Sequence, residues 1–303
     1  MTAIRAENIV RNYGAVQALK GVSLSAEKGE LFGLIGPDGA GKTTLIRILV
    51  TLLKPDSGSA FVSGYDVVKE FRVIRNITGY MPGRFSLYQD LTVEENLQFF
   101  ATIFNTTIKE NYALIKDIYI QLEPFKDRRA GKLSGGMKQK LALCCALIHR
   151  PEVLILDEPT TGVDAVSRRE FWELLKSYKK EGITTIVSTP YMDEAGLCER
   201  VALIQEGCIL DTDTPQAITG RFPRPLFRIR AKPVTAVLEA LRSFGNDPLA
   251  WIFGQDIHFC NDHLSPEADA IHQYLVNKGL QVESCTPVKA GIEDCFLWMM
   301  KKS

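Results

Sequence analysis

The sequence predicts an α/β fold with a largely parallel sheet, followed by a small α+β domain. Apolar runs of strand length alternate with segments of helical length, and this alternation is typical of a parallel sheet. A glycine-rich loop separates one of these runs from the next helical segment. The composition changes at residues 220–231, where two prolines and four arginines fall within "GRFPRPLFRIRA". We interpret this change as a linker that leads into a second domain.

The composition is that of a globular protein with balanced charge. Apolar residues make up 46% of the 303 residues, and 36 basic residues balance 36 acidic ones. Because a general nucleic-acid binder needs a basic excess, we expect no nucleic-acid partner. The sequence has no signal-peptide pattern. No apolar run approaches the length of about 18 residues that a membrane span needs. The seven scattered cysteines lack zinc spacing, so we expect a cytoplasmic protein with reduced, buried thiols.

The first part of the chain alternates strands and helices around the glycine-rich loop. Residues 1–30 predict short strands, and the run from Ile183 to Thr189 predicts a buried strand that ends at Pro190 before an acidic, helix-like segment. The other predicted elements are a turn at "RNYG" (11–14), a strand at 31–36, the loop at 36–41, a helix at 42–53, a turn at 54–58, and strands at "SAFVSG" and "EVLILDEP".

A helical subdomain is expected at about residues 84–150, within a first domain that spans residues 1–222. "TVEENLQFFATIF" begins with Thr92 as a helix cap and continues with an acidic first turn. "LSGGMKQKLALCCALIH" places glycines before a long apolar helix. The second domain spans residues 223–303, and residues 226–303 predict the order β-α-β-β-α-β, with helices at "VTAVLEALRSF" and "ADAIHQYLVNKGL". This order indicates a small ferredoxin-like accessory domain.

The loop "GPDGAGKT" fits the pattern G-x-x-x-x-G-K-[ST], with a strand before it and a helix after it. Glycines allow backbone amides to curl around phosphate oxygens, and the following helix directs its positive end at the anion. Lys42 can reach the β- and γ-phosphates, Thr43 can ligate Mg²⁺, and Thr44 would support the α-phosphate side. The candidate binding residues are Gly36, Asp38, Gly39, Ala40, Gly41, Lys42, Thr43 and Thr44. The structural alternative is an ordinary strand-to-helix turn.

Two carboxylates follow four apolar residues in "VLILDEP". Asp157 can hold Mg²⁺ through its water shell, and Glu158 can act as a general base or orient an attacking water. The alternative is a turn or helix-capping pair after a strand. Together with the phosphate loop, the pair favours Glu158 and Lys42 as the catalytic residues and Thr43 and Asp157 as the metal site.

These residues resemble the ATP-binding-cassette (ABC) ATPases, which are P-loop NTPases, over about residues 3–222. The segment "LSGGMKQKLALCCALIHRPEVLILDEPTTGVD" (133–164) carries most of the resemblance. The resemblance implies that two cassettes sandwich two ATP molecules with Mg²⁺, each site using one subunit's phosphate loop and the other's signature. It assigns Ser134, Gly135 and Gly136 to the signature, Asp164 to the dimer seam and Tyr13 to stacking on adenine. A capped helix, and an exposed strand-end aromatic at Tyr13, remain the structural alternatives.

The segment "GYMPGRFSLYQDLTVEENL" (79–97) resembles the region of such cassettes that touches a membrane subunit. The similarity is to cassettes of drug, lipid and polysaccharide exporters whose permease is a separate chain. It implies a peripheral protein on the inner face of the cell membrane that partners with a permease and a second ABC subunit. We expect a homodimer or a heterodimer of cassettes, and a C-terminal domain that is regulatory or stabilises the dimer.

Two positions depart from the family pattern. Gly83 stands where the family has a glutamine, and Pro190 stands where it has a histidine that contacts the γ-phosphate. Gln89 is six residues beyond Gly83 and would need a shifted loop to replace the glutamine. None of His149, His258, His263 and His272 is placed by sequence to replace the histidine. Because each such contact contributes about 10²–10³ in rate in other enzymes, we expect slow hydrolysis at this chain's own site.

The sequence-based hypothesis is an ATP-binding and hydrolysing subunit of a membrane exporter. Its own site would be weakened, and its intact signature would act on a partner's site. One alternative is a regulatory cassette that binds nucleotide without hydrolysis, although the retained Glu158 argues against it. Another is a cassette protein of translation or DNA repair that is not part of a transporter. Such proteins usually have two cassettes or a long coiled coil and a basic surface, features that the neutral sequence lacks.

Overall fold

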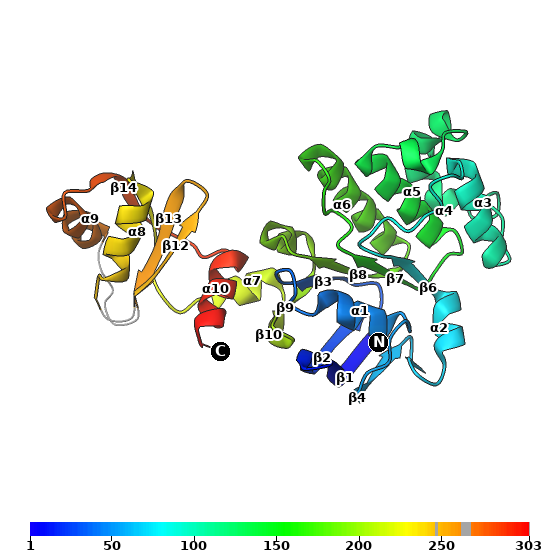
Figure 1. Cartoon of the computed structure of the whole chain (residues 1–303), viewed down its shortest axis with the longest axis horizontal. Coiled ribbons are helices and arrows are strands. Elements are labelled where there is room, and N and C mark those ends of the chain that lie inside the picture. Colours follow the sequence, from blue (N-terminus) through cyan, green and yellow to red (C-terminus); the bar gives the residue numbers. More distant parts are fainter. Residues whose placement is uncertain (246–247, 262–267, 303) are drawn as a thin grey trace. The chain divides into compact units, whose positions relative to one another are not determined.

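The computed structural model describes residues 1–245, 248–261 and 268–302. The chain divides into two compact units, Met1–Pro215 and Gln216–Ser303 (Figure 1). The division therefore precedes the change in composition at residues 220–231, and most of the helix Pro215–Gly220 belongs to the second unit.

Two sheets form the framework of the first unit. Its strands are β1 (Thr2–Tyr13), β2 (Val16–Glu27), β3 (Leu31–Ile35), β4 (Ser57–Val62), β5 (Tyr65–Asp66), β6 (Thr78–Met81), β7 (Val153–Asp157), β8 (Thr184–Thr189), β9 (Arg200–Gln205) and β10 (Cys208–Asp213). One sheet is antiparallel in the order β2-β1-β4-β5, and the other has the order β10-β9-β3-β8-β7-β6. All neighbours in the second sheet are parallel except β9 and β10, which confirms the predicted parallel sheet.

The helices of the first unit lie around these sheets. They are α1 (Lys42–Leu49), α2 (Phe71–Ile77), α3 (Val93–Ile103), α4 (Tyr112–Leu122), α5 (Gly135–Leu147) and α6 (Ala165–Lys180), with short 3₁₀ turns at Glu123–Phe125, Ala130–Lys132 and Met192–Leu197. Helices α3, α4 and α5 lie within residues 84–150, the range in which the sequence predicts a helical subdomain. The capping box is present at Thr92, whose hydroxyl accepts from the amide of Glu95 while the Glu95 carboxylate accepts from the amide of Thr92.

The helix after the glycine-rich loop is shorter than the sequence predicts. We expected residues 42–53, but α1 ends at Leu49, with Val50 as its C-cap. Thr51 has a φ of 63°, in the left-handed region, and a helix cannot continue through such a residue. The apolar residues that follow Leu49 therefore belong to a turn.

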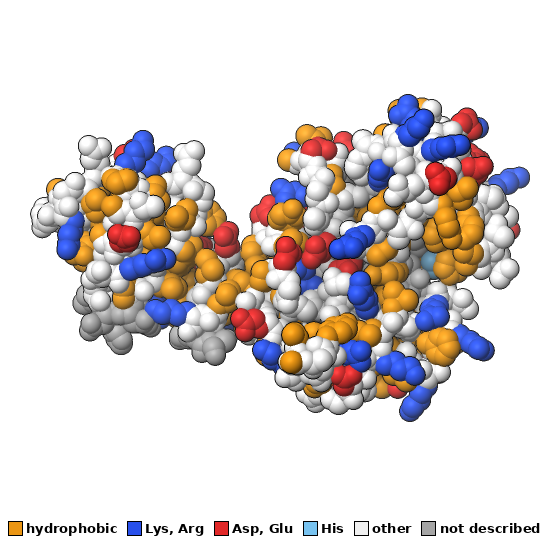
Figure 2. Space-filling view, in the orientation of Figure 1, with side chains coloured by type: hydrophobic (Ala, Val, Ile, Leu, Met, Phe, Trp, Pro, Cys, Tyr) orange, Lys and Arg blue, Asp and Glu red, His pale blue; other side chains and the backbone are white. Residues whose placement is uncertain are grey.

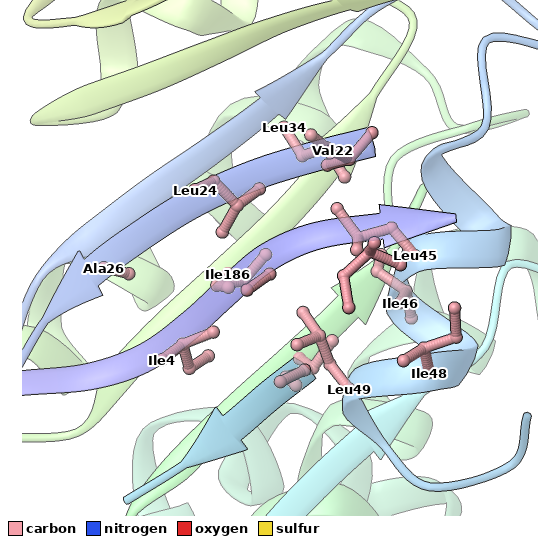
Figure 3. Close-up of a cluster of buried hydrophobic side chains, with 14 of the residues drawn as sticks. Ile4, Val22, Leu24, Ala26, Leu34, Leu45, Ile46, Ile48, Leu49 and Ile186 are labelled. Carbon is pink, nitrogen blue, oxygen red and sulfur yellow. The ribbon is translucent and has the colours of Figure 1, made fainter. Parts of the chain in front are cut away.

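A buried core joins α1 to both sheets. Figure 3 shows side chains from β1, β2, β3, β8 and α1 that point toward one another. Its members include Ile4, Val22, Leu24, Ala26, Leu34, Leu45, Ile46, Ile48, Leu49 and Ile186. Because β3 and α1 are both buried in this core, the loop between them is fixed at both of its ends.

The second unit is a four-stranded antiparallel sheet with helices. Its elements are α7 (Pro215–Gly220), β11 (Leu226–Lys232), α8 (Val234–Arg242), β12 (Pro248–Phe253), β13 (Asp256–Asn261), α9 (Ala268–Asn277), β14 (Gln281–Val288) and α10 (Ile292–Lys302). The sheet order is β12-β13-β11-β14. From β11 to β14 the described elements follow the predicted β-α-β-β-α-β order. The final helix, α10, was not predicted, and its Asp294 carboxylate accepts from Trp251 of β12.

None of the described helices combines the length and apolarity needed to cross a membrane. The seven cysteines form no disulfide, and five of them are buried, Cys208 being exposed and Cys285 intermediate.

Candidate functional site

The glycine-rich loop runs from the end of β3 to the start of α1. Gly36 approaches the chain so closely that an added Cβ would lie 2.1 Å from the carbonyl oxygen of Ile204. Gly41 has a φ of 106° and caps α1 without a side-chain hydrogen bond. Asp38 and Gly39 are exposed at the tip, whereas Ala40 is buried. The loop thus presents backbone amides and a helix N-terminus, which together suit an anion.

Hydrogen bonds brace the loop from two neighbouring segments. The amide of Gly36 donates to the carbonyl of Thr189 at the end of β8, at 3.2 Å. The amide of Gly207, in the turn between β9 and β10, donates to the carbonyl of Ala40 at 3.0 Å. The loop is therefore held in place by the parallel sheet as well as by its own covalent ends.

Replacing Gly36 with alanine is expected to destabilise the first unit by about 3 kcal/mol, because the new methyl group would overlap a backbone oxygen that cannot move aside alone. Thermal unfolding of the purified variant would measure this. Gly196→Ala is the matched control, because a Cβ at Gly196 meets no atom within 4 Å. Equal unfolding temperatures for the two variants would contradict the prediction.

Lys42 extends from the first turn of α1 into the loop. Its side chain is 3% exposed, and its Nζ donates to the carbonyl oxygens of Gly36 at 2.8 Å and Pro37 at 2.9 Å. The same Nζ lies 3.0 Å from Oε1 of Glu158, which follows β7. The structure thus brings together the two residues that the sequence nominates as catalytic.

Thr43 and Asp157 meet beside this ion pair. The Thr43 hydroxyl donates to Oδ1 of Asp157 at 3.2 Å, and the Ser188 hydroxyl of β8 donates to the same oxygen at 2.7 Å. Asp157 is 2% exposed. A hydroxyl and a carboxylate in contact at a phosphate loop form an oxygen donor set that fits Mg²⁺. Thr44 is partly buried in the same first turn of α1.

Glu158 has an unusual backbone conformation. Its φ is 50°, a left-handed value that is uncommon for a residue with a Cβ. The Glu158 amide donates to the carbonyl oxygen of Ser188 at 3.1 Å and to its hydroxyl at 3.0 Å. Strained residues of this kind cluster at functional sites. Ser188 was not among the predicted site residues, and its only sequence signal is a hydroxyl within a buried strand.

Both departures from the family pattern border this group. A Cβ at Gly83 would lie 3.0 Å from the carbonyl oxygen of Asp157 and 3.8 Å from Cβ of Glu158. Pro190 directly follows Thr189, whose carbonyl holds the phosphate loop. A cavity of about 180 Å³, whose lining includes Gly83, Glu158 and Gly135, adjoins position 83.

The residues considered as replacements lie elsewhere. The backbone carbonyl of Gln89 accepts a hydrogen bond from the amide of Gly131 at 2.9 Å. His149 stacks on Phe104 with 3.7 Å between ring centroids, and burial lowers its pKa to about 4. His258 and His272 are in the second unit, and His263 lies outside the described residues.

The predicted signature and dimer-seam residues occupy the starts of two helices. Ser134 caps α5, and its hydroxyl accepts from the amide of Met137 at 3.3 Å. Gly136 lies so close to α6 that an added Cβ would be 2.9 Å from the hydroxyl of Ser167, and Gly135 is the first residue of α5. Asp164 caps α6 by accepting from two amides, which lowers the pKa of its carboxyl group. The structural alternative of a capped helix is thus present as well.

Tyr13 ends β1 in a hairpin that flanks the phosphate loop. It pairs with Val16 across the hairpin, and it is 44% exposed. The next residues of β2 reach the loop, because a Cβ at Gly41 would lie 2.7 Å from the carbonyl oxygen of Ala18. The Tyr13 ring is therefore accessible to solvent in a hairpin beside the phosphate loop.

One buried contact near the site escaped sequence analysis. Glu194 is 1% exposed and accepts from the Thr160 hydroxyl at 2.9 Å. The Arg168 guanidinium lies 3.9 Å from the same carboxylate. This contact joins the segment after Pro190 to the loop after Glu158. No local sequence pattern predicts it, because its residues are far apart in the chain.

Comparisons with known proteins agree with this geometry. A family model described as "ABC transporter" matches residues 19–161. Over 214 residues the chain is 39% identical to the Nod factor export ATP-binding protein I of Burkholderia lata. The match covers 70% of this chain and 70% of that protein. The chain belongs to the ABC transporter ATP-binding proteins. This membership confirms the family resemblance predicted from the sequence.

Other relatives of this ABC protein include longer chains. It is 50% identical over 194 residues to YbhF of Escherichia coli, a probable multidrug ABC transporter ATP-binding protein. That match covers 63% of this chain and 33% of YbhF, so the chain spans about a third of that relative.

A solved structure confirms the ABC ATPase fold. It is a dimeric ATP-binding cassette in a post-hydrolysis state, bound to ADP and Pi. The TM-score is 0.63 at 25% sequence identity, and the match covers 70% of this chain and 98% of that one. That cassette is thus matched almost completely within 70% of this chain.

Proposed function

We propose that the chain is the ATP-binding and ATP-hydrolysing subunit of an ABC exporter, peripheral on the inner face of the cell membrane. The observation that carries the proposal is the meeting of Lys42 with Glu158 and of Thr43 with Asp157 at one braced phosphate loop. Membership of the ABC family and a cassette structure bound to ADP and Pi support ATP as the substrate.

Each residue then has a defined task. The amides of the loop and the Lys42 ammonium bind the β- and γ-phosphates, while the first turn of α1, with Thr44, supports the α-phosphate side. Thr43 and Asp157 would hold Mg²⁺, directly and through water respectively. Bound Mg²⁺ supplies positive charge that neutralises the phosphate oxygens. Glu158 accepts a proton from the attacking water or orients it.

A second copy or a related cassette would complete the site. Ser134, Gly135 and Gly136 lie at the start of α5, where free amides suit the γ-phosphate of a nucleotide on the opposite subunit. Asp164 would lie at the seam. The dimeric assembly of the similar cassette supports this arrangement.

A groove in the first unit fits the proposed permease contact. Its volume is about 600 Å³, and its lining includes Met81, Pro82, Ser86 and Leu87, all within the segment 79–97 that resembles the permease-contacting region. Figure 2 shows hydrophobic side chains gathered beside α3, with lysines and arginines around α2. An amphipathic helix of a membrane subunit would bury its apolar face in such a groove.

Hydrolysis at this chain's own site is proposed to be slow. Gly83 offers no side chain toward the attacking water, and Pro190 offers no proton donor or acceptor toward the γ-phosphate. The intact signature would still serve a partner's site. The same two residues favour the second candidate function, a cassette that binds nucleotide for regulation without cleaving it.

The experiment is a comparison of nucleotide binding and phosphate release by the purified chain and its Glu158→Gln variant. We expect the variant to bind MgATP at least as tightly as the wild type and to release phosphate about 100-fold more slowly, because a general base typically contributes 10²–10⁴ in rate. Glu152→Gln is the control, because Glu152 is an exposed carboxylate at the opposite end of β7. Equal rates for all three proteins would favour the regulatory function, and absence of ATP binding by the wild type would refute both.

A further inference from the structure

The end of β1 is cross-linked to the turn after α1 through one carboxylate. Oδ1 of Asp56 accepts from Nη1 of Arg11 at 2.6 Å. Oδ2 of Asp56 accepts from the backbone amide of Asn12 at 2.7 Å and from its side-chain amide at 3.0 Å. These donors, chiefly the Asn12 amide, lower the pKa of Asp56. A single side chain therefore fixes the two residues that precede Tyr13.

Arg11 is held from a second direction and covers the Tyr13 ring. Its Nη1 also donates to the carbonyl oxygen of Lys54 at 3.3 Å. The centre of its guanidinium lies 5.3 Å from the centroid of the Tyr13 ring. The guanidinium side chain is 24% exposed, whereas Tyr13 remains 44% exposed. One face of the ring thus rests on an anchored cation, and the remaining exposed surface is available to a ligand.

The anchoring turn belongs to the same segment as the phosphate loop. Asp56 lies in the connection between α1 and β4, and its amide donates to the carbonyl of Val10 at 2.9 Å. The opposite strand of the Tyr13 hairpin packs on Gly41. The ring is therefore fixed relative to the loop through β2 on one side and through Asp56 on the other.

We propose that Arg11 and Asp56 are positioning residues that hold the Tyr13 ring for stacking on the base of a nucleoside triphosphate. The proposal rests on the nucleotide-binding function proposed above. Arg11 supports the covered face of the ring, and Asp56 fixes Arg11 and the backbone before Tyr13. Stacking on a free side chain would require ordering that ring on binding, whereas the anchored ring is already ordered.

The test separates the base from the phosphates. Dissociation constants for MgATP and for magnesium tripolyphosphate, which has no base, are measured by calorimetry on the full chain. We expect Arg11→Ala and Asp56→Ala to weaken MgATP binding by about five- to twentyfold, the range expected when part of a base–aromatic stack is lost. Binding of tripolyphosphate should change by less than about twofold. Arg11→Lys, which keeps a cation, should restore part of the loss.

Two further sets of variants test whether the loss of affinity comes from a general disturbance of the fold. Arg5→Ala is the matched control, because Arg5 lies on the same strand as Arg11 and its guanidinium lies 4.6 Å from the ring centroid of Phe61 on β4, in a similar cation–π pair. It should leave both dissociation constants unchanged. In a Tyr13→Ala background, Arg11→Ala should weaken MgATP binding no further, because the ring through which it acts is gone.

Equal weakening of MgATP and tripolyphosphate by Arg11→Ala would overturn the inference, as would additive effects of Arg11→Ala and Tyr13→Ala. If Asp56→Ala does not fold, the Arg11 variants decide the question. A wild-type chain that binds tripolyphosphate but gains nothing from the base would refute the inference alone. A wild-type chain that binds neither ligand would refute the proposed function as well.

Discussion

Replacing Lys42 with alanine is expected to weaken MgATP binding by at least about 100-fold, which corresponds to about 2.7 kcal/mol. The ammonium is buried within the loop, where its attraction to phosphate is screened little by water. Its removal also leaves the Glu158 carboxylate uncompensated beside the phosphates, so that repulsion adds to the lost attraction. Calorimetric titration of the purified variant with MgATP would measure the change.

Lys28→Ala is the control for this variant, because Lys28 is an exposed lysine whose backbone amide, which the substitution keeps, donates to the carbonyl of Met1. Its affinity for MgATP should equal that of the wild type. Circular dichroism would show whether Lys42→Ala retains the fold. A folded Lys42→Ala protein with wild-type affinity would mean that the loop is only a strand-to-helix turn.

Restoring both side chains that the family pattern has at positions 83 and 190 is expected to raise ATP hydrolysis about 100-fold or more. Each polar contact to the water or the γ-phosphate typically contributes about 10²–10³ in rate. A Cβ at position 83 would lie 3.0 Å from the carbonyl oxygen of Asp157 and 3.8 Å from Cβ of Glu158, and it would adjoin a cavity of about 180 Å³. The measurement is single-turnover phosphate release by Gly83→Gln/Pro190→His.

The restored variant needs controls that fill the same space without the same chemistry. Gly83→Met resembles glutamine in size but cannot donate a hydrogen bond, and Pro190→Ala removes the ring without adding an imidazole. Neither control should raise the rate. A wild-type chain that already hydrolyses ATP rapidly, unchanged by the restored pair, would refute the weakened-site proposal. Equal gains from the glutamine and methionine variants would show that filling the cavity is sufficient.

The fold was predictable where one short segment contains its own signal. The strand β7 is buried along its whole length, and a continuous apolar run announces it. Thr92 and Glu95 lie three residues apart and form a capping box, so the start of α3 could be predicted from one short segment. The end of α1 could not be predicted in this way, because the apolar residues after Leu49 continue the helical pattern. Only the structure shows that Thr51 has a left-handed conformation.

The same distinction applies to the site. The loop at Lys42 and the carboxylates at Asp157 and Glu158 are contiguous motifs, so the sequence nominated them directly. Ser188 meets Asp157 from 31 positions away, and Arg11 meets Asp56 from 45 positions away. Such contacts are created by sheet order and hairpin placement, and hydrophobic periodicity carries no information about either.

The ion pair between Lys42 and Glu158 has a consequence for selectivity among anions. The ammonium already has a carboxylate 3.0 Å away, so an approaching anion must compete with an internal one. Chloride or a single phosphate offers little beyond the charge that Glu158 provides. A chain of phosphates would also engage the loop amides and the start of α1, and these additional donors would favour it over the carboxylate. We therefore expect the Glu158 carboxylate to disfavour the binding of small anions at Lys42.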